Sequence, residues 1–239
     1  KIDDQVYKRD LTKPNIPDLT MDVADPVQYG IITVEKYDLD TNSATPANPN
    51  YSLDGAVYTV YSDSSCTTPA VAAYGENTIT VKNAFGASGW FAEGTYWVKE
   101  TTAPTGYDLD THIYQVTTTG GKAAKIESRD PIKRGAIAIE KHDAVTGSTA
   151  SATDAYSMDG AEYTIFSDEA CSNALKTLTI QDGKASTDKE FILGTYYVKE
   201  TKAPQYYKAD TNVYKVDVNA DLSNPDRRYI VDAKSILGI

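Results

Sequence analysis

Short segments in which apolar and polar residues alternate recur along the whole chain. Examples are GIITVEKYD, AVYTVYS, NTITVKN and GTYWVKE, each bounded by Gly, Asn, Asp or Pro. Such alternation is typical of a β-strand with one buried face, and no segment keeps an apolar period of about 3.6 residues over three helical turns. The pattern therefore predicts an all-β chain made of immunoglobulin-like β-sandwiches.

This series of segments occurs twice, which predicts two tandem domains. ITVEKYD returns as IAIEKHD, and GTYWVKETTAP returns as GTYYVKETKAP. Lys36 and Lys141 are 105 residues apart but Glu100 and Glu200 only 100, so we expect about five extra residues in the first copy, in a loop around Gly86–Gly89. We predict domains at residues 31–132 and 133–239. The joint DPIKRG is short and contains Pro131, which favours a stiff rod.

Residues 1–30 resemble the end of a further copy. VYKRDL is similar to VYKVDV, and VADPVQYG is similar to SRDPIKRG. This segment would supply the last strands of a preceding repeat, and an added strand on the first domain is the alternative. The chain is expected to be an interior piece of a longer, exported protein.

Composition excludes several classes of function. With 41% apolar residues, the 239-residue chain can form ordinary packed cores. A net charge of −11 argues against nucleic acid and anionic membrane as partners, and no stretch is apolar enough to span a bilayer. Cys66 and Cys171 lie at equivalent places of the two copies, which predicts unpaired thiols. We predict neither a metal site nor a cofactor.

Alternation places ionisable residues on faces that should be buried. Lys36 shares a face with Ile32 and Val34, and Glu100 shares one with Tyr96 and Val98. The second copy repeats both arrangements at Lys141 and Glu200, and its last strand, RRYIVDAK, groups Asp232 with Ile230.

Burial of these groups would favour a specific reaction. Desolvation lowers the pKa of a lysine and raises that of a carboxyl by as much as about 3 to 5 units. A neutral amine beside a protonated carboxylic acid is a nucleophile beside an electrophile, and their condensation gives an amide and water. The alternative is that these residues are solvated charges at strand edges, each contributing well under about 1 kcal/mol.

EKHD, VKETKAP and IVDAK resemble the lysine, glutamate and aspartate segments of CnaB-type domains, the SpaA-like repeats of Gram-positive pilins and adhesins. The resemblance covers essentially the whole chain and implies prealbumin-like sandwiches with an autocatalytic intramolecular isopeptide bond. By this match Lys141 is the nucleophile, Asp232 the acceptor and Glu200 the proton shuttle. The reaction would occur once per domain, so the chain is not expected to be a turnover enzyme.

The first domain matches this family less well. Lys36 and Glu100 correspond directly, but an ungapped alignment of the last strand puts Ser128 at the acceptor position. Asp130 has the same strand parity, so we predict Asp130 as acceptor with Glu100 as its proton shuttle. Glu127 and an uncrosslinked domain remain alternatives.

The resemblance implies a structural stalk or shaft segment of a Gram-positive cell-surface adhesin or pilin, outside the cell at the wall. Its partners would be adjoining repeats of the same parent chain, and the crosslinks would resist force and proteolysis. The alternative is an adhesive module that binds a host matrix protein or glycan through exposed aromatics such as Trp97 and the loop at residues 83–90. A third hypothesis is that the chain is a pilin polymerised by sortase at Lys13, although the sequence contains no LPXTG-like sorting signal.

Overall fold

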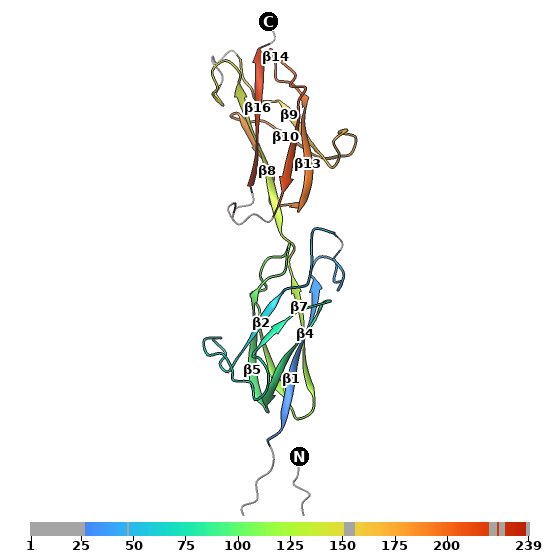
Figure 1. The fold of residues 1–239 in the computed structure, drawn as a ribbon. Coiled ribbons are helices and arrows are strands. Elements are labelled where there is room, and N and C mark those ends of the chain that lie inside the picture. The colour runs from blue at the N-terminus through green and yellow to red at the C-terminus, as the bar shows by residue number, and fades with distance from the viewer. Residues whose placement is uncertain (1–26, 47, 151–155, 220–223, 225–227, 238–239) are drawn as a thin grey trace, which may run out of the picture. The chain divides into compact units, whose positions relative to one another are not determined.

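Two compact β-units make up the structure. The computed structural model describes residues 27–46, 48–150, 156–219, 224 and 228–237, and over these residues it contains strands, turns and loops but no helix (Figure 1). The units divide between Pro131 and Ile132. The prediction of an all-β chain with tandem sandwiches is confirmed. The predictions for residues 1–26, including Lys13, concern positions outside the described part of the chain.

The first unit is a sandwich of two sheets. One has the strand order β4-β1-β7 and the other β3-β2-β5-β6. The strands are β1 (Tyr29–Asp38), β2 (Val57–Tyr61), β3 (Thr78–Thr80), β4 (Phe85–Ala92), β5 (Gly94–Thr102), β6 (Ile113–Thr118) and β7 (Ala123–Asp130). β1 and β7 are parallel neighbours, with Lys36 opposite Ser128 and Asp38 opposite Asp130. The first and last strands of the unit therefore lie side by side.

The core of this unit lies between its two sheets. β1 contributes Ile32 and Val34, and β5 contributes Val98, all three fully buried. Tyr58 and Val60 of β2 pack into the same cluster. The alternation read from the sequence is confirmed here, because Lys36 and Glu100 lie on the same buried faces as these apolar residues.

The second unit repeats this plan. Its sheets have the orders β10-β9-β13-β15 and β11-β8-β16-β14, with β12 also paired to β8. The strands are β8 (Arg134–Asp143), β9 (Glu162–Phe166), β10 (Ala174–Thr179), β11 (Lys184–Ser186), β12 (Phe191–Ile192), β13 (Gly194–Lys202), β14 (Tyr207–Lys208), β15 (Val213–Val218) and β16 (Arg228–Leu237). β16 is the parallel neighbour of β8, as β7 is of β1.

The register of β16 sets which of its residues face the core. Ala233 lies opposite Lys141, and Ser235 lies opposite Asp143. In the first unit the same places opposite Lys36 and Asp38 belong to Ser128 and Asp130. Structurally, Ala233 therefore replaces Ser128, and Ser235 replaces Asp130.

The prediction that the extra residues of the first copy lie around Gly86–Gly89 is wrong, because these residues belong to β4. Tyr58 pairs with Ile79 and its counterpart Tyr163 with Leu178, so the added length precedes β3, between Cys66 and Thr78. The inserted loop returns against β4: a Cβ at Gly89 would lie only 2.3 Å from the carbonyl oxygen of Tyr74. The glycine thus marks where the loop touches the strand.

The cysteine prediction is confirmed for the described residues, in which Cys66 and Cys171 are both free thiols. Each lies within a turn organised by an aspartate. Asp63 accepts hydrogen bonds from the backbone of Thr68, and Asp168 accepts them from the backbone of Asn173. The cysteines therefore belong to matching turns and not to a crosslink.

Candidate functional site

A lysine side chain is fully buried between the sheets of the first domain. Lys36 extends from β1, Asp130 lies at the end of β7 in the same sheet, and Glu100 projects from β5 in the opposite sheet. All three side chains have 0% exposure. The structure therefore brings together the three residues that the sequence singled out in this domain.

Four oxygen-bearing groups surround the amine of Lys36. Its Nζ donates to Glu100 Oε1 at 2.8 Å and to Ser128 Oγ at 3.0 Å. It also contacts Tyr58 Oη and Asp130 Oδ1 at short range. One ammonium thus faces two carboxyl groups in a fully buried site.

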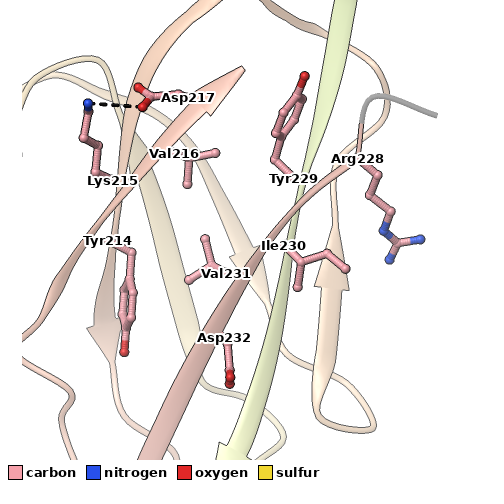
Figure 2. A pocket seen from close by; sticks show the side chains of 9 residues that line it. All are labelled: Tyr214, Lys215, Val216, Asp217, Arg228, Tyr229, Ile230, Val231 and Asp232. Atoms are coloured by element: carbon pink, nitrogen blue, oxygen red, sulfur yellow. Dashed lines mark ion pairs between the residues drawn. The ribbon is translucent and has the colours of Figure 1, made fainter. Parts of the chain in front are cut away.

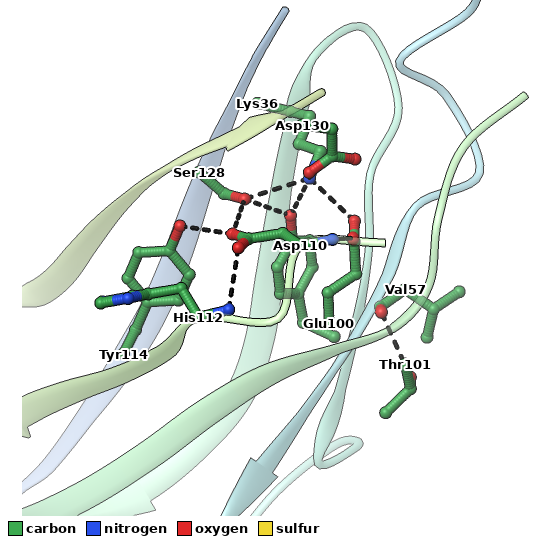
Figure 3. A network of polar contacts seen from close by, with 10 residues as sticks. Lys36, Val57, Glu100, Thr101, Asp110, His112, Tyr114, Ser128 and Asp130 are labelled. Atoms are coloured by element: carbon green, nitrogen blue, oxygen red, sulfur yellow. Dashed lines mark hydrogen bonds and ion pairs between the residues drawn. The ribbon is translucent and has the colours of Figure 1, made fainter. Parts of the chain in front are cut away.

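A chain of hydrogen bonds leads away from this amine through Ser128 (Figure 3). Ser128 Oγ donates to Asp110 Oδ2 at 3.0 Å and accepts from Tyr58 Oη at 2.7 Å. Asp110 Oδ2 also accepts from Tyr114 Oη at 2.6 Å, and the backbone N–H of Asp110 donates to Glu100 Oε2 at 2.7 Å. Asp110 is only partly buried, so it connects the interior site with the surface.

The electrostatics of the site favour a protonated acceptor. Burial raises the pKa of Asp130 to about 7, although the charge and hydrogen bond of Lys36 act to lower it. No described residue donates a hydrogen bond to Asp130 Oδ2. Because an ionised carboxylate with an unsatisfied buried oxygen is costly, the neutral acid is strongly populated near neutral pH. A neutral carboxylic acid is the form that an amine can attack.

Tyr58 contributes a neutral phenol to this site. Burial, followed by the charge of Glu100, raises the pKa of its hydroxyl far above the ordinary value. The phenol can therefore orient Lys36 by a hydrogen bond, but it cannot serve as a base near neutral pH.

The second domain retains part of this arrangement. Lys141 is 0% exposed, and its Nζ donates to Tyr163 Oη and to Glu200 Oε1, both at 2.8 Å. Glu200 accepts a hydrogen bond from the backbone N–H of Asp210, as Glu100 does from that of Asp110. Among the described residues, the ion-pair partner of Lys141 is Glu200 and no second carboxyl faces its amine.

The prediction that Asp232 lies on the core face with Ile230 is wrong. Val231 and Ala233 are buried, whereas the Asp232 side chain is 68% exposed and lies 3.3 Å from His142 Nε2. Ile230 and Asp232 line an open groove between β15 and β16 (Figure 2). The sequence-based alternation of buried and exposed residues in β16 is shifted by one residue from the observed one. Ile230 and Val231 are both suitable core residues, and only the pairing with β8 decides between them.

Glu127, the alternative acceptor in the first domain, also faces outward. Its carboxylate pairs with Lys125 at 3.3 Å and with Arg129 at 3.1 Å on the surface of the sheet. Side-chain alternation along β7 instead buries Ser128 and Asp130. The structure thus separates Glu127 from Lys36.

Sequence reasoning gave no role to Tyr58, Ser128 or Asp110. A signal for two of them was present, because Tyr58 and Asp110 recur as Tyr163 and Asp210 in matching segments of the repeat. Ser128 has no such counterpart, since the equivalent residue is Ala233. Its hydroxyl could be recognised only once the strands were paired.

No group of three or more metal-ligating side chains occurs among the described residues. Likewise, this part of the chain contains no helix that is both long and apolar enough to cross a membrane.

Comparison with known proteins identifies the repeated unit. The model of the SpaA family, described as a prealbumin-like fold domain, matches residues 30–131 and 135–226. A search of curated proteins finds no match.

The chain is also similar to solved structures. The chain is similar to the Bacillus anthracis TIE protein, with 21% identity and a TM-score of 0.60 over 88% of this chain and 34% of that one. It is also similar to a C-terminal fragment of the pilus adhesin SpaC from Lactobacillus rhamnosus GG, with 17% identity and a TM-score of 0.44 over 88% of this chain and 97% of that one. At these identities the likeness concerns the fold alone. The present chain spans about a third of the length of the Bacillus anthracis protein.

Proposed function

The chain belongs to the SpaA family of prealbumin-like fold domains, and we propose that it is a load-bearing stalk segment of a Gram-positive cell-surface adhesin or pilin. Its role is structural, and its partners are adjoining repeats of the same parent chain. An intramolecular amide bond between Lys36 and Asp130 stabilises the first domain.

The observation that carries this proposal is the fully buried cluster of Lys36, Glu100 and Asp130. Burying one ammonium against two carboxyl groups costs more desolvation than a single ion pair recovers. Condensation removes both the ammonium and one carboxyl, so the folded domain gains stability from the reaction. The oriented approach of the two groups replaces an activating cofactor, since intramolecular reactions reach effective molarities of about 10⁵ M or more.

The proposed reaction uses each member of the cluster once. The neutral amine of Lys36 attacks Cγ of the protonated Asp130, and a C–N bond forms. Glu100 accepts a proton from the nitrogen and returns it to the departing hydroxyl, which leaves as water. The C–O bond to that hydroxyl breaks, and the products are one amide and one water molecule.

The second domain is proposed to remain uncrosslinked. Its Lys141–Glu200 pair lacks a second carboxyl among the described residues, and Ser235 occupies the strand position of Asp130. The outward position of Asp232 gives it no access to Lys141 while β16 keeps this register.

The bond would change how the first domain carries tension. β1 and β7 are the first and last strands of the domain and are parallel neighbours. A covalent link from Lys36 to Asp130 passes force directly between them and leaves the intervening residues unloaded. The same link restricts the unfolded chain in the manner of a disulfide.

Peptide mapping tests this proposal. A proteolytic digest of the purified chain should contain one branched peptide that joins Lys36 to Asp130 and lacks the mass of one water. Glu100→Gln is the matched control and should yield the two peptides separately. Finding Lys36 and Asp130 only in unlinked peptides of the wild-type chain would contradict the proposal.

A second candidate function is adhesion through aromatic side chains of the first domain. Trp97 is half-buried, but Tyr74 is 65% exposed and Trp90 is 44% exposed, and the two residues form a β-bridge. A solid-phase screen against matrix proteins and glycans tests it. Adhesion predicts binding that Trp90→Ala abolishes, whereas a spacer binds none of them.

A further inference from the structure

Ser128 lies beside the reacting groups but has no role in the condensation proposed above. It is fully buried, and its hydroxyl lies between the amine of Lys36 and the carboxylate of Asp110. The second domain has Ala233 at this place and no acceptor aspartate beside it. The hydroxyl is therefore present where the reactive cluster is complete and absent where it is not.

The amine must lose a proton before it can attack. When Asp130 is already the neutral acid, the ammonium proton cannot go to Asp130. Of the other groups around Nζ, Tyr58 is held as a neutral phenol, and Glu100 is needed to carry the later proton to the leaving hydroxyl. Ser128 is the remaining contact, and its own hydrogen already points to Asp110 Oδ2.

We propose that Ser128 relays the first proton of the Lys36 ammonium to Asp110, which releases it to solvent. Ser128 Oγ accepts a proton from Nζ as it donates its own to Asp110 Oδ2, so the hydroxyl is unchanged. The amine then condenses with the protonated Asp130 as described above. The sum is an ammonium and a carboxylic acid converted to an amide, one water and one proton delivered to solvent.

The surroundings of Asp110 suit this role. Its side chain is partly buried, so a proton that reaches it can pass to water. Tyr114 and the backbone N–H of His112 fix its two oxygens at 2.6 Å and 2.9 Å. The backbone N–H of Asp110 also donates a hydrogen bond to Glu100. This loop residue therefore positions Glu100 and is itself the acceptor of the relayed proton. Ser128 touches a reacting atom, whereas Asp110 acts through it as a positioning residue and proton acceptor.

The inference rests on the proposed function, and a kinetic experiment separates the two. The full chain is recovered from inclusion bodies directly into urea, before it has folded and condensed, then diluted to start folding and quenched with acid at intervals, and intact mass reports the loss of water. If the wild-type chain and all variants keep their full mass, the proposed function fails. If the wild type condenses and Ser128→Ala condenses equally fast, only the relay fails.

The relay predicts that Ser128→Ala and Asp110→Asn each slow the loss of water roughly 100-fold, as expected when one proton transfer is no longer assisted. Ser128→Thr keeps the hydroxyl and should restore the rate to within about tenfold. Asp210→Asn, the matched change in the second domain, should leave the rate unaltered.

The pH profile distinguishes a relay from a purely structural role. Between about pH 5 and about pH 7 the wild-type rate should be nearly constant, because Asp110 removes the proton. In Ser128→Ala and Asp110→Asn the rate should rise with pH over this range, since solvent must deprotonate the amine. A uniform reduction at every pH would overturn the relay and leave Ser128 and Asp110 as packing residues.

Discussion

The two domains share a buried lysine–glutamate pair, but only the first sets a second carboxyl against the lysine. Lys36 faces Glu100 and Asp130, whereas Lys141 faces Glu200 and, within the described chain, no further carboxyl. The two arrangements differ at two positions of the last strand of each domain. These positions hold Ser128 and Asp130 in the first domain and Ala233 and Ser235 in the second. The same fold can thus hold either a reactive cluster or a simple buried ion pair.

Glu100→Gln should have the largest effect. Without the proton shuttle the amide does not form, and the first domain loses about 4 to 5 kcal/mol of unfolding free energy, as expected for a link closing a loop of about 100 residues. Denaturant unfolding combined with intact mass measures both changes. Glu200→Gln is the matched variant and should keep the wild-type deficit of one water relative to its own calculated mass. An equal change in this deficit for both variants would remove the distinction between the domains.

Ser235→Asp should convert the second domain to the first type. The new carboxyl occupies the register position of Asp130, and condensation with Lys141 should remove one more water and add about 4 to 5 kcal/mol to the stability of that domain, because the closed loop is again about 100 residues long. Mass and thermal unfolding report the outcome, with Ser235→Ala as the control. Condensation in the alanine variant would show that the acceptor is another residue.

Lys141→Met should cost the second domain about 3 kcal/mol. The substitution leaves the buried Glu200 carboxylate without its cation, and an uncompensated buried charge is strongly destabilising. The double variant Lys141→Met/Glu200→Gln should recover most of this loss, which denaturant unfolding can measure. A single variant as stable as the wild type would mean that the pair is not buried in solution.

Lys36→Met should make the stability of the first domain depend on pH. Without the amide, Asp130 keeps its carboxyl, and burial and Glu100 hold the pKa of Asp130 near or above the value of about 7 that it has beside Lys36. Because the unfolded pKa is about 4, the folded state binds the extra proton between these values. Stability is therefore highest in acid and falls by up to about 1.4 kcal/mol per pH unit as pH rises towards 7. Thermal unfolding should show no such trend from this residue in the crosslinked wild type.

Asp232→Asn should have the smallest effect. The carboxylate is mostly exposed and, among the described residues, its ion-pair partner is His142, so its loss should cost under about 1 kcal/mol and leave the mass deficit of the chain unchanged. Intact mass and thermal unfolding check this. If Asp232→Asn lacked one water molecule fewer than the wild type, β16 would adopt the other register and bring Asp232 to Lys141.

Most of the fold could be predicted from the sequence, because strand alternation and the internal repeat are local signals. The same signals placed Lys36, Lys141, Glu100 and Glu200 on buried faces, since each follows apolar residues at unambiguous spacing. The prediction was wrong at β16. In YIVDAK both alternating sets contain an apolar residue, and the choice between them depends on pairing with a strand far away in the sequence.

The polar groups around Lys36 could not be predicted from the sequence, for a different reason. Tyr58 and Ser128 are ordinary strand residues whose hydroxyls matter only because two sheets bring them to one amine. Asp110 lies in a loop, where alternation carries no information. Such convergence is a property of the packed sandwich and is not visible in any single segment.

The mass of the intact wild-type chain tests the central claim most directly. One condensed domain and one uncondensed domain predict a mass below that calculated from the sequence by one water molecule. The full calculated mass would show that Lys36 and Asp130 remain an ion pair, and a deficit of two waters would show that the second domain also condenses; either result contradicts the account.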